Sequence, residues 1–395
     1  MKTRSQRLLA GLVAMVIATA VWLPCLHFVF LRPVNGFRQE AGISPKARAL
    51  AAEQLELWTD PARQKMEVGK MRNSNPEWDF MGRSFLVWSL ANMSLREPAS
   101  KVANLRVMDR IIDETLRIEK EQGICFFLMS YAKPDQYVVR PARSLFLDGE
   151  IGLMLAARRM VEEKAEYKQL LTERVDLMAD GLHNSPHLML ESYPDECWTF
   201  DHCVALDAMK LADRLDGSDH SALIHGWVAM AREKLVDPKS GLLIASFTTT
   251  GAPLAGPQGS TLWMAAHSLQ LLDEDFARDQ YERARKELGT VTLGFGYAHE
   301  WPATWPGPAN VDSGPIFPGF DISAGSSGMA FIGAAAFGDA SFLQSLAATV
   351  DFAGFPQHSR GRLKYCASNQ VGDAALLYAA TLGPLWQIAK TGGKP

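Results

Sequence analysis

The sequence is poor in cysteine, histidine and basic charge. Among its 395 residues there are five cysteines and nine histidines, and no Cys-x-x-Cys pair. A zinc site would therefore need ligands gathered from distant segments. The net charge is −4 and the pI is near 6.2, with no basic stripe along the chain. Because nucleic-acid binding depends on clustered Lys and Arg side chains, we expect neither a nucleic-acid partner nor a metal site.

The sequence also lacks an internal linker. No Gly/Ser-rich or Pro-rich stretch divides the chain, although 395 residues exceed the usual size of one domain. Large barrels nevertheless fold as single domains. We therefore expect one domain, which we assign to residues 38–395 and interpret as the catalytic domain.

The first 37 residues differ from the rest. Three basic residues, Lys2, Arg4 and Arg7, precede an uncharged run over residues 8–31 that ends at Arg32. A run of about 20 apolar residues can span a bilayer, and basic residues before it favour a cytoplasmic N-terminus. Residues 1–37 are therefore predicted to be a cytoplasmic stub and a single-pass inner-membrane anchor. Residues 38–395 would then lie in the periplasm or outside the cell.

A cleavable signal peptide is the competing interpretation. The apolar run is longer than the typical hydrophobic region of a signal peptide, about 7–15 residues, and no clean small-x-small cleavage site follows it. Cys25 follows Trp-Leu-Pro, so it lacks the small residue that precedes the cysteine of a lipoprotein signal. We therefore favour an uncleaved anchor.

After the anchor, segments with helical periodicity alternate between two kinds. One kind is charged or amphipathic, as in residues 45–70, 101–122, 165–182, 221–236, 275–288 and 341–352. The other kind is largely apolar, as in residues 78–95, 142–160, 201–215, 260–272, 322–337 and 371–388. A helix that is apolar on all sides must be enclosed by other helices.

Six enclosed helices inside six amphipathic ones are the plan of an (α/α)6 barrel. No strand pattern longer than residues 242–249 opposes this all-α fold. The alternative that the sequence leaves open is an irregular α-bundle.

The inner helices of such a barrel run parallel, so their first turns open at one end. The loops that lead into them are rich in Pro, Gly, aromatic residues and acids, whereas opposite connections such as 96–100 and 216–220 are short. Irregular loops on a rigid scaffold commonly carry binding and catalytic residues. We therefore predict the functional site at the loop-rich end.

Three acids, Glu150, Asp201 and Asp321, lie near the starts of predicted inner helices. Burial would raise the pKa of such a carboxyl and suit a general acid. A carboxylate near Arg83 or His202 would stay ionised and suit a base. Simple N-capping is the alternative for each acid.

The loop before residues 201–215 also brings Cys197 close in sequence to Cys203. An extracytoplasmic compartment would permit a disulfide between them, and the sequence leaves that bridge open. In either state we expect the two cysteines to be structural, with the chemistry carried by Asp201.

A second long loop carries aromatic side chains that would wall a pocket over the barrel mouth. They are Phe295, Tyr297, His299, Trp301, Trp305 and Phe317, and the acids Glu300 and Asp312 lie among them. Flat apolar walls suit either sugar rings or an isoprenoid chain. The sequence does not decide between these ligands.

Residues from about 143 to 281 resemble the linalool dehydratase/isomerase family. The resemblance is carried by Leu147-Asp-Gly-Glu-Ile-Gly-Leu-Met-Leu155, Tyr193-Pro-Asp-Glu196, Val204-Ala-Leu206 and residues 212–219, 234–242 and 263–273. It implies an (α/α)6-barrel enzyme that removes or moves a hydroxyl group on an acyclic terpene alcohol without a cofactor.

The chain departs from the pattern of that family at several site positions. Glu150 stands where the family has a histidine, and Ser192 and Asp201 stand where it has two active-site cysteines. Cys197 and Cys203 are nearby but shifted in sequence. The resemblance therefore supports the scaffold better than the substrate, and it implies a divergent, membrane-anchored member.

The leading hypothesis is a cofactor-free lyase or isomerase that acts on a hydroxylated small lipid or terpenoid-like substrate. Glu150 and Asp201 would form the acid/base pair, and the supporting polar groups would be Asp79, His202 and Asp321. The residues expected to bind substrate are Arg83, Tyr193, Asp195, Cys197, Trp198, Cys203, Trp301 and Asp312.

The rival hypothesis is a periplasmic glycan-active hydrolase, lyase or epimerase, because (α/α)6 barrels also host paired carboxylates. A closed apolar pocket would favour the lipid, and an open groove with stacked tryptophans would favour the glycan. A membrane-tethered binding protein is the third hypothesis, favoured if the carboxylates are scattered or act as caps. The sequence leaves a homo-oligomer open.

Overall fold

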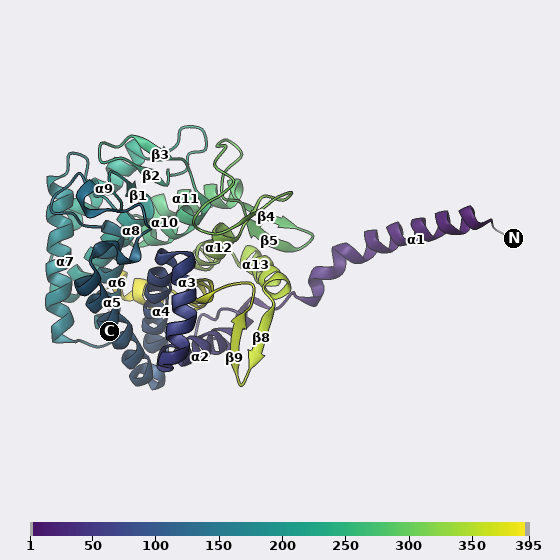
Figure 1. Cartoon of the computed structure of the whole chain (residues 1–395), viewed down its shortest axis with the longest axis horizontal. Helices are drawn as coiled ribbons and strands as arrows, with labels where there is room; N and C mark the ends of the chain where they lie inside the picture. The colour runs from purple at the N-terminus through teal and green to yellow at the C-terminus, as the bar shows by residue number, and fades with distance from the viewer. Residues whose placement is uncertain (1–2, 392–395) are drawn as a thin grey trace.

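Helix α1 (Arg4–Cys25) stands clear of a helical body in the computed structural model, which describes residues 3–391 (Figure 1). None of its residues is buried. Within the described residues, the stretch Arg4–Val29 is the one helical segment long and apolar enough to cross a membrane, and a signal sequence would meet the same criterion. The short helices η1 (Leu26–Val29) and η2 (Val34–Gly36) connect it to the body.

Six largely buried helices form a closed ring in the body. They are α4 (Pro76–Arg96), α6 (Leu145–Val161), α8 (Thr199–Asp216), α10 (Gly259–Leu272), α12 (Ala324–Ala336) and α14 (Gln370–Thr381). Each contacts the next, and α14 returns to contact α4. The fold is therefore all-α and its inner ring is that of an (α/α)6 barrel, as the sequence predicts.

The remaining helices cover this ring. They are α2 (Pro45–Thr59), α3 (Pro61–Ser74), α5 (Lys101–Gln122), α7 (Ala165–Asn184), α9 (Ser221–Lys234), α11 (Glu274–Glu287), α13 (Ala340–Ala353) and α15 (Pro384–Thr391). Most carry charges outward and a row of apolar residues inward. In α5, for example, Met108, Ile111 and Ile112 are fully buried beside exposed acids and bases.

Two predicted helices are each broken in two. Residues 45–70 divide at Asp60, whose carboxylate accepts hydrogen bonds from the backbone of Ala62 and Arg63 and so begins α3 at Pro61. Residues 371–388 divide before Pro384, where Gly383 has a φ of 128°. The cause is the same in both: proline disfavours helical backbone at the residue before it and has no N–H to continue the ladder.

Short antiparallel strands lie in the connections between the barrel helices. They are β1 (Cys197–Trp198), β2 (Ser246–Phe247), β3 (Pro253–Ala255), β4 (Gly289–Thr292), β5 (Phe295–Ala298), β6 (Ile316–Phe317), β7 (Ile322–Ser323), β8 (Pro356–Ser359) and β9 (Arg362–Tyr365). The first three pair in the order β1-β2-β3, and the others form the hairpins β4–β5, β6–β7 and β8–β9.

Helices α6 and α8 approach closely because glycine faces alanine along their contact. A Cβ atom added at Gly149 would lie 3.0 Å from the backbone nitrogen of Ala205, and one added at Gly152 would lie 3.2 Å from the Cβ of Ala208. Small facing residues let two helix backbones come together. This contact brings Glu150 of α6 near the first turn of α8.

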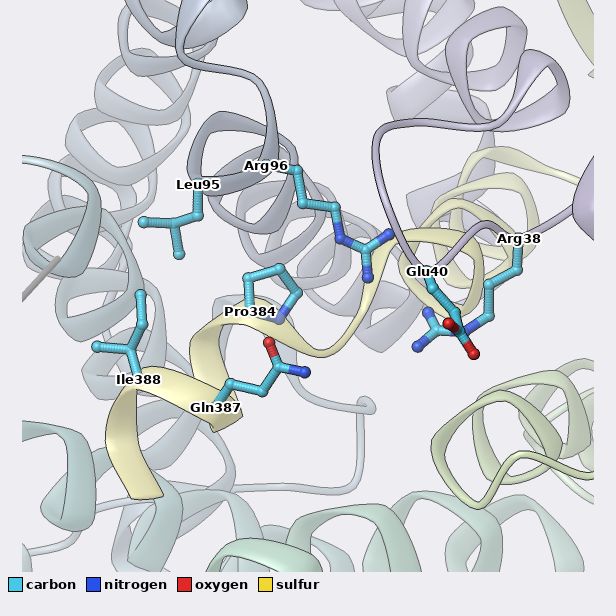
Figure 2. A pocket seen from close by; sticks show the side chains of 7 residues that line it. All are labelled: Arg38, Glu40, Leu95, Arg96, Pro384, Gln387 and Ile388. Atoms are coloured by element: carbon cyan, nitrogen blue, oxygen red, sulfur yellow. The ribbon is translucent and has the colours of Figure 1, made fainter. Parts of the chain in front are cut away.

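We call the end of the barrel opposite the loop-rich end the plain end. There two arginines, one before α2 and one at the end of α4, hold the segment that follows α14. Arg38 and Arg96 each donate a hydrogen bond to the carbonyl oxygen of Leu382, at 2.8 Å and 2.7 Å, just after α14. Figure 2 shows both beside a cavity of about 570 Å³. Because each guanidinium also binds another backbone carbonyl, we assign this pair to closing the barrel.

Candidate functional site

Five carboxyl groups interact at the loop-rich end of the barrel. They are Glu77 in the first turn of α4, Glu150 in α6, Asp201 in the first turn of α8, and Glu196 and Asp312 in loops. The charge of another member raises the pKa of Glu77, Glu150, Glu196 and Asp201. The Asp312 carboxylate is the neighbour that raises the pKa of Glu77 and Glu196. We refer to these five residues as the carboxyl cluster.

Glu77 is held in the cluster by a tyrosine. The hydroxyl group of Tyr193 donates a hydrogen bond to Glu77 and accepts one from the backbone N–H of Met129 at 3.0 Å, while the ring stacks on Tyr131 at 4.9 Å. Burial raises the pKa of Glu77 to about 8; the neighbouring Asp312 carboxylate adds to the rise and the Tyr193 hydrogen bond opposes it. Glu77 is therefore mostly protonated at neutral pH.

Glu150 is the most deeply buried member of the cluster. One of its oxygens accepts a hydrogen bond from the hydroxyl of Ser84 at 2.5 Å, and the other has no partner. Burial raises the pKa of Glu150 well above its usual range, and the charges of Asp201 and Glu77 reinforce this. Glu150 is therefore neutral in the folded protein.

Asp201 titrates near neutrality. Burial raises its pKa to about 7, the nearby Ser192 hydroxyl opposes the rise and the charge of Glu196 adds to it. Asp201 does not serve as the N-cap of α8, because that position belongs to Trp198. Glu150 lies inside α6, whose N-cap is Ser144. The capping interpretation therefore fails for both acids.

The two loop members lie where the cluster meets the surface. Glu196 accepts hydrogen bonds from Nε1 of Trp198 at 2.8 Å and from the hydroxyl of Tyr131 at 3.4 Å. The backbone carbonyl of Asp312 accepts a hydrogen bond from the Asn75 side chain at 3.2 Å. Burial raises the pKa of both carboxyl groups.

A cavity of about 320 Å³ opens beside Asp312 and the start of α4. Its lining is mixed, with apolar and amide side chains. It consists of Ser74, Asn75, Trp78, Met129, Ala309, Asn310, Val311, Asp312, Gly314, Pro315 and Ile316. Asp312 is the member of the carboxyl cluster that lines this cavity, and Asn75 and Trp78 of its wall lie next to Glu77 in α4 and its N-cap.

Asp79 and Arg83 lie apart from the cluster, in an ion pair with each other. Nε of Arg83 is 2.7 Å from Asp79, and its Nη2 is 3.1 Å from Glu114 of α5. These contacts fix α4 against the outer helix α5. Asp79 and Arg83 were predicted as site residues, and their placement here is structural.

His202 and Asp321 also lie outside the cluster. Nδ1 of His202 is 2.7 Å from the Trp198 carbonyl, its Nε2 accepts from the backbone of Leu190, and its ring stacks on Trp227. Burial lowers the pKa of His202 to about 4, so the ring is neutral. Asp321 is exposed in the turn between β6 and β7, with a φ of 50°.

Other predicted binding residues have local roles. The carboxylate of Asp195 accepts from the hydroxyl of Thr249 at 2.8 Å and is exposed. Nε1 of Trp301 donates to the carbonyl of Pro308 at 3.0 Å. Of the predicted substrate-binding residues, Tyr193, Trp198 and Asp312 are the ones that contact or belong to the cluster.

The expected aromatic wall is not formed by its tryptophans. The ring of Trp305 packs directly over Gly256, and that of Trp301 packs over Gly307, where any added Cβ would collide with them. Phe295 lies against Phe30, shortly after α1, with 6.3 Å between the ring centroids. Trp301 therefore packs within its own loop, whereas Trp305 packs on the segment after β3, and neither lines the cavity beside Asp312.

Cys197 and Cys203 are both free thiols in the core, and no disulfide joins them. Burial raises the pKa of each thiol, with nearby carboxylates adding to the rise. A neutral, buried thiol is a poor nucleophile. The structural role expected for both cysteines stays a prediction, and the disulfide that the sequence left open is not formed.

Glu77, Glu196 and Tyr131 were not predicted as site residues. Glu77 and Asp79 both lie in the first turn of α4, and the sequence carried one signal that separates them: Asp79 has Arg83 four residues later, the spacing of a helical ion pair, whereas Glu77 has no such partner. Tyr131 comes from the loop after α5, which has no distinctive motif, so no sequence signal identifies it.

Comparisons with known proteins add little to this geometry. No protein-family model matches the sequence, and no curated protein matches it. Among solved structures, the chain is similar to a GH76 α-mannanase of Bacteroides thetaiotaomicron, with a TM-score of 0.44 and 11% identity over 76% of this chain and 84% of that one. At this level neither the residues nor the activity of that enzyme transfers to the chain.

Proposed function

We propose that the protein is an enzyme that breaks a carbon–oxygen bond of a hydroxylated substrate by general acid/base catalysis. The observation that carries the proposal is the gathering of buried carboxyl groups at the loop-rich end, with Glu77 bonded to Tyr193 and Glu150 bonded to Ser84. Burial raises the pKa of Glu77 to about 8 and that of Asp201 to about 7, so both groups exchange protons near neutral pH. An acid and a base of opposite protonation state are what such a reaction needs.

In this proposal Glu77 is the general acid. It would protonate the oxygen that leaves, and Tyr193 would hold its carboxyl group in place through their hydrogen bond. Asp201 would accept a proton from the substrate or from a water molecule. Glu150, neutral and fixed by Ser84, would add a hydrogen-bonding group beside Asp201 without adding charge.

The leading substrate class remains a hydroxylated small lipid or terpenoid-like alcohol, as the family resemblance implies. Protonation of the hydroxyl by Glu77 and proton removal by Asp201 would expel water as an alkene forms, or return it at another carbon. Trp78, Val311, Pro315 and Ile316 give the cavity apolar surface for a hydrocarbon chain. No redox cofactor takes part in this proton balance.

Glycan hydrolysis or epimerisation is the second candidate. It is favoured by the polar share of the cavity wall, where Asn75, Asn310 and Asp312 offer hydrogen-bonding groups to a hydroxyl-rich ligand. The same acid would protonate a glycosidic oxygen, and the base would activate water.

The test compares Glu77→Gln with a matched control, Asp373→Asn. Asp373, at the start of α14, is also buried with a pKa of about 8 but does not belong to the cluster. Purified full-length protein is assayed on a panel of acyclic allylic alcohols and a panel of short oligosaccharides. We expect one panel to be turned over, with a loss of 10²-fold or more in Glu77→Gln, the order expected for removing a general acid, and little change in Asp373→Asn.

The pH profile supplies a second readout. Wild-type kcat/KM should be bell-shaped, with limbs near the pKa values of about 7 and about 8. Glu77→Gln should remove the alkaline limb from any residual activity. Full turnover by Glu77→Gln, or a loss in Asp373→Asn alone, would rule out the assignment of the acid.

A further inference from the structure

An uncharged, apolar surface surrounds the point where α1 leaves the barrel. Three segments form it: residues 26–31 after α1, the hairpin 289–298 (β4–β5), and residues 352–357 between α13 and β8, none of which holds an Asp, Glu, Lys or Arg. Figure 1 shows α1 emerging beside β4, β5, α13 and β8. We call these three segments the collar.

Ring contacts fasten the three parts of the collar together. Phe30 lies 5.1 Å from Phe352 and 6.3 Å from Phe295, and Phe295 lies 5.1 Å from Phe352, measured between ring centroids. His27 approaches Gly294 so closely that an added Cβ would lie 2.3 Å from the imidazole. The base of the anchor is therefore docked on the barrel at a defined position.

Large apolar side chains of the collar point into solvent. Phe355 is 68% exposed, Phe28 is 61% exposed and Leu293 is 44% exposed. Single exposed apolar residues are ordinary, but a contiguous apolar surface without charges marks a contact with a partner or a membrane.

Two of these residues also occupy backbone positions that disfavour them. Leu293 has a φ of 51° in the two-residue turn between β4 and β5, and Phe355 has a φ of 51° before Pro356. Such a hairpin turn strongly prefers Asn or Asp followed by Gly. A bulky apolar residue there is strained and, in water, poorly solvated.

We infer that the collar is a second membrane-contact surface, resting in the interface of the same bilayer that α1 would span. The occupant is a lipid bilayer because the collar is continuous with the one candidate membrane span in residues 3–391. In a bilayer interface the strained Leu293 and Phe355 become favourable, since their side chains leave water. The contact orients the barrel on the membrane.

The contact also sets where the cavity faces. The hairpin β6–β7 contacts β5 of the collar and carries exposed Phe317 and Phe320, while Ile316 of the same hairpin lines the cavity. Apolar side chains thus lead from the collar towards the candidate site. This path suits a substrate that partitions into lipid, a consequence that rests on the proposed function.

Spin labelling of the full-length chain in phosphatidylcholine vesicles tests the contact. With Cys25, Cys125 and Cys366 replaced by Ser, single cysteines are placed at 293 and 355, and at 254 as the control. Leu254, in β3, is equally exposed and apolar but lies outside the collar. Cys197 and Cys203 are buried and will not react in the folded protein.

Labels at 293 and 355 are expected to be relaxed more by oxygen than by a water-soluble nickel chelate, and the label at 254 the reverse. Equal exposure of all three to the nickel chelate would overturn the inference. So would spin–spin broadening between labels at 293 of two chains, since it would make the collar an interface between copies. Either result leaves the acid/base assignment untouched.

A variant of the β4–β5 turn should change Tm differently in water and in vesicles. Leu293→Asn suits the backbone of the turn, so in water it should raise Tm. In vesicles, where the collar rests in lipid, we expect Leu293→Asn to leave Tm unchanged or lower it. A higher Tm in vesicles would contradict the contact.

Discussion

At the residue scale, the partner of a carboxyl group decides its role. Asp79 and Glu77 lie two residues apart in the first turn of α4, yet Asp79 is neutralised by Arg83 while Glu77 is bonded to a neutral tyrosine. A buried carboxylate that is paired with a cation has a structural role. A buried carboxyl group without a neighbouring cation has a raised pKa, so it keeps its proton to higher pH and can donate it to a substrate near neutral pH.

Glu77 should therefore make the protein less stable as pH rises. Its pKa is about 8 when folded, against an ordinary value of 4.5, so between these values the folded state binds more protons than the unfolded state. This contribution is fully present below pH 4.5 and is lost as pH rises through 8. Glu77→Gln should gain stability over the wild type across that window, by a few kcal/mol at about 1.4 kcal/mol per pKa unit.

Denaturant unfolding of the full-length chain at several pH values between 4.5 and 9 measures this difference. Asp373→Asn should show the same trend, because its pKa is also about 8. The wild-type free energy of unfolding should fall relative to that of Glu77→Gln as pH rises. If it does not, Glu77 is already ionised across this range and cannot act as the general acid.

At the element scale, helix periodicity and proline account for most of what could be predicted. The segment 101–122 matches α5 at both ends, and several inner helices begin within a few residues of the expected position. The breaks at Pro61 and Pro384 were missed because the apolar pattern continues across them. Proline as the first residue of a helix and glycine before proline were both visible in the sequence.

The cluster itself could be only partly predicted. Glu150 and Asp201 were found because each is an acid near the start of an apolar helix. His202, next to Asp201, points to the outer helix α9 through Trp227, and a rotation of about 100° per residue separates the two side chains. The sequence predicts to which helix a residue belongs, but the packing of the helices decides which neighbour its side chain contacts.

The contact between α6 and α8 should tolerate no added atoms. We expect Gly149→Ala to cost about 1–2 kcal/mol of folding free energy, since a Cβ there presses on the backbone of Ala205 and overpacking outweighs the gain in helix propensity. The control is Gly69→Ala in α3, where a Cβ meets nothing within 4 Å and should stabilise by about 0.5–1 kcal/mol. Urea unfolding of both variants checks the pair, and equal effects would show that the helices are not closely packed at Gly149.

At the scale of the whole molecule, the closed ring brings residues of three neighbouring inner helices, α4, α6 and α8, together with two loop residues into one site. Because each inner helix contacts the next and α14 returns to α4, residues more than a hundred positions apart reach one end of the barrel. The sequence predicted the barrel, because six helices that are apolar on all sides must be enclosed by other helices. The sequence predicted Asp312 in a long loop over the barrel mouth, but that loop has no periodicity from which its contact with the cluster could be predicted.

Ring closure itself depends on the plain end, and this gives the last prediction. Arg96 donates to the carbonyls of Gln39 and Leu382, at 3.0 Å and 2.7 Å, and so joins α4 to residues before α2 and after α14. A lysine carries its donors on one nitrogen and does not reproduce the planar fork that reaches the two carbonyls from separate nitrogens. Arg96→Lys should therefore lower the free energy of unfolding by about 1.5–3 kcal/mol, the net contribution of a hydrogen bond made by a charged group, while Arg38 still donates to the Leu382 carbonyl.

Arg117→Lys is the control for that substitution. Arg117 forms an exposed ion pair with Glu121 one turn along α5, which contributes only about 0.3–0.5 kcal/mol. Arg117→Lys should thus be nearly neutral under the same denaturant titration. If Arg96→Lys were equally neutral, the barrel would be closed by helix packing alone, and the two arginines beside the cavity at the plain end would need another explanation.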